Sequence, residues 1–408
     1  MFKNHVALYI SNNEDKKRIV ESIQTGTLFE NLVGLKTLLF SELTLDKFIK
    51  EELQYDQFNI ETIHKNKLSQ ASGGERKKAL LKYLISQNPE CLIVDNVFDS
   101  LDSASQKAIA LQLETLSDNT IIIQVLTRKH QLLPFILNLY QFHNNTFKKV
   151  ERLETQVSYK FLLDKLPQPE HEFDTDFKSL VKFNKVSIQY GERPIVRNIT
   201  WEIKPGDFWQ LIGPNGAGKS TLITLITGDN PKAYGQDLVL FGRQKGSGES
   251  VWDIKNNIGH YSAEILRGFR RLDSVEKMML SGFYDSIGLY KFPTERQKFI
   301  AHDWLKMLGL FELRDKDFLS LSVGHQRLVL IARAMVKHPP LLILDEPTNG
   351  LDDADAVIFS ELVNKIASES KTAILYVSHQ KEASILRPDF IYELTPSTLG
   401  SQGKVVHV

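Results

Sequence analysis

A glycine-rich segment in the second half of the sequence has the residue types that bind phosphate. The segment GPNGAGKST fits the pattern G-x-x-x-x-G-K-[ST], follows the apolar run Phe208 to Ile212 and precedes the helix-like TLITLIT. Glycines let backbone N–H groups turn toward phosphate oxygens, and a helix start adds positive potential. The predicted phosphate cradle consists of Gly213, Pro214, Asn215, Gly216, Ala217, Gly218, Lys219, Ser220 and Thr221.

Four side chains in this half suit nucleotide hydrolysis. We expect Lys219 to reach the β and γ phosphates of ATP, and Ser220 to ligate Mg²⁺. The apolar run LLILDE ends in two carboxylates, Asp345 and Glu346. Asp345 would hold the Mg²⁺ shell, and Glu346 would orient or deprotonate the attacking water. Acids at a strand end are weak evidence alone, but here they lie 23 residues after a Ser-x-Gly turn at Ser322.

The segment that contains these carboxylates occurs twice. Residues Ser72 to Asp102 read SGGERKKALLKYLISQNPECLIVDNVFDSLD, and Ser322 to Asp352 read SVGHQRLVLIARAMVKHPPLLILDEPTNGLD. In both copies the aspartate that ends the apolar run lies 23 positions after the serine. A second gapless match pairs Leu211–Gly228 with Tyr9–Gly26. Equal spacing through helix, loop and strand predicts two copies of one architecture.

The elements that position these residues are those of an α/β fold. Continuous apolar runs such as ECLIV and LLILD lie beside amphipathic segments, which predicts mainly parallel sheets covered by helices on both faces. The segment KLPQPEHEFDTDF contains prolines and acids without apolar periodicity and is typical of a linker. We therefore place one domain at residues 1–164, a linker at 165–177 and a second domain at 178–408.

Composition narrows the possible functions. The 408 residues include 50 Lys plus Arg and 50 Asp plus Glu, so the net charge is zero and gives no strong nucleic-acid signal. A single cysteine, Cys91, excludes an intrachain disulfide and lies in an apolar run that predicts a buried thiol. Neither a leader-like N-terminus nor an 18-residue apolar stretch occurs. We expect a cytoplasmic protein, with peripheral binding at the inner face of the cell membrane as an option.

The order of motifs in the second half resembles that of an ATP-binding-cassette (ABC) ATPase. The motifs are GPNGAGKST, LSVGHQ, LLILDEPTNGLD and YVSH, of which LSVGH corresponds to the family signature LSGGQ. This resemblance implies two P-loop NTPase cassettes of the ABC type in tandem. It also implies that Tyr190 stacks on adenine, that His379 senses the γ-phosphate and that Asp352 lies in the loop crossing between cassettes. The simpler alternatives are a strand-end aromatic for Tyr190 and a capping or solvated histidine for His379.

The first half departs from the family pattern. It has SNNEDKKRI where the glycines should be, with Lys17 at the lysine position and Arg18 at that of the Mg²⁺-binding serine. Asn96 replaces the catalytic glutamate, and Thr127 or a neighbour replaces the histidine, since His130 fits only with a shifted register. Acidic side chains and Cβ atoms in the loop would oppose phosphate binding. We therefore predict a truncated first cassette without a working phosphate loop.

The signature turn shows the opposite pattern. In the first half it is intact, with the residues Ser72, Gly73, Gly74 and Glu75, whereas the second half has Val323 and His325 instead of Gly and Gln. Two cassettes of this family sandwich ATP head to tail, so the resemblance implies that the intact loop faces Ser72–Glu75. We predict one complete composite site through intramolecular pairing of the cassettes. Independent drift of each motif and homodimerisation of the second cassettes are the alternatives.

The biological role is a separate prediction. The chain resembles molybdate-transport-type or photorepair-type ABC ATP-binding proteins, which implies a Mg²⁺- and ATP-dependent motor on a separately encoded membrane permease. Ala263, beside Glu264, stands where the family carries a glutamine that relays to the membrane partner, which weakens the transport interpretation. The alternative is a soluble ABC ATPase that acts on a ribosomal or nucleic-acid partner. A regulatory protein that holds ATP without turnover is disfavoured by the intact Glu346 and His379.

Overall fold

The computed structural model describes residues 5–55, 60, 62, 67–99, 101–143, 146–154, 161, 165–170, 177–262, 273–379 and 385–407. Its internal contacts define two units. The first comprises Met1–Val157 with Gly350–Asp355, and the second comprises Ser158–Asn349 with Ala356–Val408. The domain limits 1–164, 165–177 and 178–408 remain a prediction.

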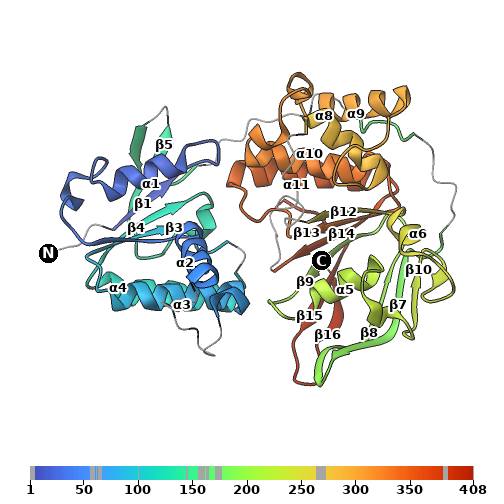
Figure 1. The fold of residues 1–408 in the computed structure, drawn as a ribbon, viewed down its shortest axis with the longest axis horizontal. Coiled ribbons are helices and arrows are strands. Elements are labelled where there is room, and N and C mark those ends of the chain that lie inside the picture. The colour runs from blue at the N-terminus through green and yellow to red at the C-terminus, as the bar shows by residue number, and fades with distance from the viewer. Residues whose placement is uncertain are drawn as a thin grey trace. The chain divides into compact units, whose positions relative to one another are not determined.

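The N-terminal unit is built on a six-stranded sheet in the order β2-β3-β4-β1-β5-β6 (Figure 1). All neighbouring strands are parallel except the antiparallel pair β5–β6. The strands are β1 (Val6–Tyr9), β2 (Thr37–Phe40), β3 (Cys91–Asp95), β4 (Ile121–Leu126), β5 (Asn138–His143) and β6 (Thr146–Val150). The helices are α1 (Lys16–Gln24), α2 (Glu42–Tyr55), α3 (Gly73–Ser86) and α4 (Ser103–Ser117).

Both faces of this sheet are buried, as its continuous apolar strands predict. Successive residues of β1 enter two different apolar clusters, Leu8 with Ile23 of α1 and Ala7 with Leu80 of α3. Cys91 on β3 is completely buried, which confirms the predicted core thiol. Burial raises the pKa of this thiol to about 11, so it stays protonated and unreactive at neutral pH.

The second unit contains a six-stranded sheet, β12-β13-β14-β9-β15-β16, and a four-stranded antiparallel sheet, β11-β10-β7-β8. Its strands are β7 (Val181–Tyr190), β8 (Arg193–Ile203), β9 (Phe208–Ile212), β10 (Leu238–Leu240), β11 (Arg243–Gln244), β12 (Ile258–Ser262), β13 (Leu341–Asp345), β14 (Ala373–Ser378), β15 (Phe390–Thr395) and β16 (Gln402–His407). Its helices are α5 (Lys219–Ile226), α6 (Val251–Lys255), α8 (Val275–Leu280), α9 (Glu295–Met307), α10 (Val323–Met335) and α11 (Asp353–Glu369).

The two six-stranded sheets have the same topology. Their strands correspond one by one along the two orders, and each ends in an antiparallel pair, β5–β6 and β15–β16. The residues after the third and thirteenth strands also make equivalent hydrogen bonds, because Asn96 N donates to Val125 O at 3.1 Å and Glu346 N donates to Val377 O at 2.9 Å. The internal repeat predicted from the sequence is therefore confirmed at the level of sheet order.

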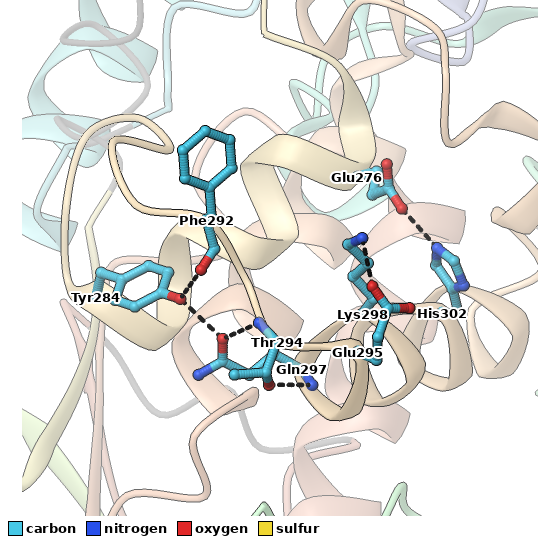
Figure 2. Close-up of polar contacts among 8 residues, drawn as sticks. All are labelled: Glu276, Tyr284, Phe292, Thr294, Glu295, Gln297, Lys298 and His302. Carbon is cyan, nitrogen blue, oxygen red and sulfur yellow. Dashed lines mark hydrogen bonds and ion pairs between the residues drawn. The ribbon is translucent and has the colours of Figure 1, made fainter.

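Helices α8 and α9 belong to a helical lobe that follows β12 in the second unit, and polar contacts tie this lobe together (Figure 2). The Gln297 Oε1 atom accepts hydrogen bonds from Tyr284 Oη at 2.8 Å and from Thr294 N at 3.0 Å, which fixes the start of α9. His302 Nε2 lies 2.6 Å from Glu276 Oε1, which links α9 to α8.

Part of the predicted linker packs on the second unit. Leu166 and Pro167 are buried, and Leu166 N donates to Glu369 Oε2 at 3.0 Å. Four residues further on, Glu170 Oε2 accepts a hydrogen bond from Gln297 Nε2 at 3.0 Å. This docked linker, residues 166–170, therefore joins the last residue of α11 to the start of α9.

Candidate nucleotide site

The phosphate-loop segment lies between β9 and α5, as its sequence context predicts. Gly218 is the N-cap of α5 and has φ +95°, a left-handed conformation that favours glycine. A Cβ atom at Gly218 would lie only 2.6 Å from Val196 Cγ1 of β8. The glycine is therefore required both by backbone conformation and by the strand packed beside it. Of the other loop residues, Gly213, Ala217 and Lys219 are buried, Thr221 is half-buried, and Pro214, Asn215, Gly216 and Ser220 are exposed.

The structure brings three predicted site residues into one connected chain. Lys219 Nζ donates to Gly213 O at 2.7 Å and lies 3.2 Å from His379 Nδ1. The other ring nitrogen, His379 Nε2, lies 2.7 Å from Glu346 Oε1. The lysine of the loop, the histidine after β14 and the glutamate after β13 thus form a continuous series of direct contacts.

Glu346 is held ionised and in a fixed position. Burial would raise the pKa of this carboxyl, but His379, with help from Lys219 and Asn349, holds it below its usual value. Asn349 Nδ2 donates to Glu346 Oε2 at 2.7 Å, a contact that the motif analysis did not identify. The backbone of Glu346 has φ +47°, an uncommon conformation for a residue other than glycine, which is typical of functional sites.

The predicted metal and adenine contacts have suitable places. Asp345 ends β13, and Ser220 lies exposed in the first turn of α5. A carboxylate and a hydroxyl suffice for Mg²⁺, because phosphates and water supply its remaining oxygens. Tyr190 ends β7 with 46% of its surface exposed, and its hydroxyl accepts a hydrogen bond from Asn230 Nδ2 at 2.8 Å. Such a fixed, exposed ring fits the predicted stacking on adenine. Among the described residues, no group of three or more His, Cys, Asp or Glu side chains forms a separate metal site.

The equivalent place in the N-terminal unit holds a neutral pair. Asn96 Nδ2 donates to Thr127 Oγ1 at 3.1 Å, and Thr127 N donates to Asn96 Oδ1 at 3.1 Å. The shared strand register places Asn96 at the position of Glu346, and Thr127 rather than His130 at that of His379. An amide cannot take a proton from water as a carboxylate can.

Both signature turns begin helices, as predicted. Ser72 is the N-cap of α3, and its backbone N and its hydroxyl each lie 2.9 Å from Glu75 Oε2. The carboxylate of Glu75 therefore completes a capping box, a role that the sequence analysis did not assign to it. Gly73 is exposed and Gly74 is buried. In the second unit Ser322 is the N-cap of α10, and its hydroxyl accepts a hydrogen bond from His325 N, without a reciprocal bond from the side chain at position 325. The residues Ala263 and Glu264, which bear on the transport interpretation, lie outside the described residues.

A phosphate loop that starts a helix, beside a strand-end carboxylate pair and a histidine from the next strand, defines a P-loop nucleotide hydrolase. Comparison with known proteins narrows this class. The family model described as ABC transporter matches residues 196–349. The ABC transporter ATP-binding protein ModF of Escherichia coli (strain K12) is 39% identical over 343 residues, which cover 80% of this chain and 70% of ModF.

Two further comparisons, one with a relative and one with a solved structure, also match ATP-binding-cassette proteins. The uncharacterized ABC transporter ATP-binding protein C323.04 of Schizosaccharomyces pombe is 29% identical over 350 residues, 83% of this chain and 71% of that protein. A model of ribosome-bound archaeal Pelota and ABCE1 contains a chain with a TM-score of 0.65 that covers 99% of this chain and 75% of its own, at 15% identity, which shows a shared fold. The chain belongs to the ABC transporter family of ATP-binding proteins.

Family membership confirms the predicted fold class and activity. The chain has the α/β fold of ABC cassettes, with mostly parallel sheets flanked by helices, and it is an ATP-binding ATPase. Within the described ranges, every helix is too short or too polar to span a bilayer.

Proposed function

We propose that the chain hydrolyses Mg²⁺-bound ATP at one competent composite site and thereby energises a separately encoded membrane transporter from the cytoplasmic side. The observation that carries the ATPase part is the contact chain Lys219–His379–Glu346, which joins the phosphate loop to an ionised carboxylate. The printed name of ModF, an ABC transporter ATP-binding protein, supports the transport part.

Each predicted site residue of the second unit has a defined task in this proposal. Lys219 and the N–H groups at the start of α5 bind phosphate oxygens. Glu346 orients the attacking water and accepts its proton, while His379 keeps the carboxylate ionised and in place. Ser220 and Asp345 would hold Mg²⁺, which supplies positive charge to the phosphates. Tyr190 offers its exposed face to the adenine ring.

The N-terminal unit contributes the second half of the composite site through Ser72–Glu75. The small residues of this turn leave the N–H groups at the start of α3 accessible, and Gly73 is exposed there. The second unit carries Val323 at the matching position, and its side chain is 37% exposed at the start of α10. A β-branched side chain at that point would crowd a phosphate. Independent loss of the two motifs would leave Ser72 without influence on turnover.

A bulky substitution at the turn tests the composite site. We expect Ser72→Trp to lower kcat by about 100-fold or more, because oriented donors to a transferring phosphate contribute on that scale. The same substitution at the other end of α3, Ser86→Trp, is the control and should leave kcat within about threefold of the unsubstituted chain. Phosphate release by purified protein gives both values. Unchanged turnover in Ser72→Trp would exclude the proposed pairing.

A binding experiment tests the transport role. The variant Glu346→Gln should bind ATP without hydrolysing it, and so prolong the nucleotide-bound state. We expect this variant to bind inside-out membrane vesicles from its own cells more tightly with Mg-ATP than without nucleotide, and to lose this binding after the vesicles are treated with protease. Nucleotide-dependent sedimentation with ribosomes, with no vesicle binding, would instead establish the alternative role on a ribosomal partner.

A further inference from the structure

Helix α1 of the N-terminal unit begins with its own anionic cap. Asp15 is the N-cap residue, and its Oδ1 atom accepts a hydrogen bond from Arg18 N at 3.0 Å. The matching helix of the second unit, α5, begins after Gly218 and has no side-chain cap. N–H groups at a helix start attract anions. A carboxylate of the chain therefore occupies the position at α1 that a phosphate would take at α5.

A second charged side chain at the start of α1 reaches the end of β3. Lys16 Nζ lies 2.9 Å from Asp95 Oδ1, and the Asp95 side chain is only 6% exposed. Asp95 ends β3 as Asp345, the proposed Mg²⁺ ligand, ends β13. Burial raises the pKa of Asp95, and Lys16 is the main group that opposes this rise. An ammonium group thus contacts the carboxylate whose counterpart would contact the metal ion.

The neighbouring lysine makes no such contact. The gapless alignment places Lys17 at the position of Lys219, but the Lys17 side chain is 79% exposed and lies 4.0 Å from Glu21 Oε1 on the same helix. Lys16 and Lys17 are therefore adjacent, equally charged residues, of which one is directed at the buried carboxylate and the other at solvent.

A helix that is one residue longer accounts for this difference. Leu8 and Leu211 occupy equivalent places in the two sheets, and Thr25 and Thr227 are the C-caps of the helices that follow. Leu8 precedes Thr25 by 17 residues, whereas Leu211 precedes Thr227 by 16. The loops between strand and helix, residues 10–15 and 213–218, both have six residues, so the extra residue lies within α1, which has nine residues against eight in α5. Counted from the strand, Lys16 therefore takes the position of Lys219, and the gapless alignment that placed Lys17 there is wrong at this point.

The carboxylate held by Lys16 is connected to the signature helix. The loop that follows Asp95 contacts α3, because Lys77 Nζ donates to Asp99 O at 2.8 Å. At the start of α3, a Cβ atom on Gly74 would lie 3.0 Å from Ser105 Oγ of α4, so the helix start is packed closely against the element that follows this loop. A displacement of Asp95 would therefore be transmitted to the turn that contains Gly74.

We propose that Asp15 and Lys16 occupy the site of the N-terminal unit in place of phosphate and metal ion, so that this unit keeps its folded site without binding nucleotide. Through Asp95, Lys16 then acts as a positioning residue for the turn Ser72–Glu75. The first statement is independent of the proposed function, whereas the second rests on it.

Nucleotide binding tests the first statement. In the full chain, Lys219→Ala removes the phosphate contact of the second unit, so any remaining binding reports the N-terminal unit. We expect no saturable fluorescence change when this variant is titrated with a fluorescent ATP analogue and Mg²⁺. Saturable binding near one nucleotide per chain would overturn the statement. The unsubstituted chain serves as the positive control.

Hydrogen exchange followed by mass spectrometry tests the ion pair within the full chain. Removal of the partly exposed Lys16 would leave the buried carboxylate of Asp95 without its cation, so we expect Lys16→Ala to speed exchange about tenfold or more in α1 and in the loop after β3. Lys17→Ala is the matched control and should leave these rates unchanged. In an Asp95→Asn background the effect of Lys16→Ala should largely disappear. Equal effects of Lys16→Ala and Lys17→Ala would overturn the proposal.

Steady-state kinetics test the positioning role. For the folded Lys16→Ala chain we expect kcat to fall about tenfold while KM for ATP stays within about twofold, because the nucleotide is held by the other unit. Lys16→Arg, which keeps the charge, should recover most of kcat. An unchanged kcat in Lys16→Ala together with a large loss in Ser72→Trp would reject the role of Lys16 alone, whereas an unchanged kcat in Ser72→Trp would reject the composite site.

Discussion

At the scale of single residues, the two contacts of His379 predict that its loss affects ATP hydrolysis more than ATP binding. It lies 3.2 Å from Lys219 Nζ and 2.7 Å from Glu346 Oε1, while Lys219 keeps its own bond to Gly213 O. We expect His379→Ala to lower kcat about 100-fold or more and to change ATP affinity by less than about threefold. Single-turnover phosphate release and nucleotide titration measure the two effects. A loss confined to affinity would show that His379 serves only to place the lysine.

A half-buried histidine makes the second unit sensitive to acid. Burial lowers the pKa of His260 on β12 from its usual 6.5 to about 4. Between these values the unfolded chain binds a proton that the folded chain does not, so stability is complete above the usual pKa and falls as pH falls toward the lowered one. We expect His260 alone to contribute a loss of roughly 1–2 kcal/mol between about pH 7 and about pH 5, beside that of His338, whose pKa burial also lowers to about 4.

Tryptophan fluorescence during urea unfolding measures this loss, because all four tryptophans lie in the second unit. His260→Gln should reduce the pH dependence, while the exposed His130 can be replaced by glutamine as a control without changing it. A pH dependence that is the same in both variants would contradict the role of His260.

Motifs located second-unit side chains that the structure brings together, because each motif residue contributes a fixed chemical group at a fixed spacing, while their roles remain predictions. Lys219 and Glu346 each contact His379, an arrangement that the motifs did not predict. The same reasoning placed Lys17 instead of Lys16 at the position of Lys219, because a gapless alignment does not show that α1 contains one residue more than α5. The ion pair from Lys16 to Asp95 is a tertiary contact that sequence spacing does not specify.

At the scale of elements, the junction of β9 and α5 depends on the glycine that caps the helix. Gly218 has φ +95°, and Val196 occupies the space that a Cβ atom at this position would need. We therefore expect Gly218→Ala to cost about 1–3 kcal/mol of stability and to weaken ATP binding about tenfold or more. Gly206 has φ +79°, lies outside the loop, and has no atom within 4 Å of the position that a Cβ would take. Gly206→Ala should therefore cost about 1 kcal/mol without affecting ATP binding.

Nucleotide titration and denaturant unfolding of both glycine variants check this prediction. Equal losses of ATP affinity in the two variants would show that general destabilisation, and not the position of Gly218 in the loop, accounts for the effect.

The positions of several strands were predictable, whereas their order in the sheets and part of the connecting structure were not. Apolar runs and the repeat located β3, β9 and β13, and the two sheets share one order because both copies of the repeat fold alike. The capping role of Glu75 could have been found from the S-x-x-E spacing, which is a capping-box pattern. The packing of the linker could not, because its proline-containing sequence has no periodicity to show which residues become buried.

At the scale of the whole molecule, the single competent site that we propose predicts how many nucleotides each chain binds. We expect Glu346→Gln to bind one Mg-ATP per chain in calorimetry and to sediment as a monomer with nucleotide, because the intact signature turn belongs to the same chain. Two nucleotides per chain would contradict a single competent site. A nucleotide-dependent dimer with one nucleotide per chain would favour pairing between second cassettes.

The docked linker has a practical consequence for dividing the protein into fragments. Leu166 and Pro167 are buried against the second unit, and His338 forms a hydrogen bond with the backbone of Pro167. A fragment that starts at residue 178, where the apolar pattern resumes, would expose the surface beneath them and remove the partner of Gln297 Nε2. A fragment designed to fold alone and crystallise should therefore begin before Leu166, and its N-terminal tag should leave that residue free to pack.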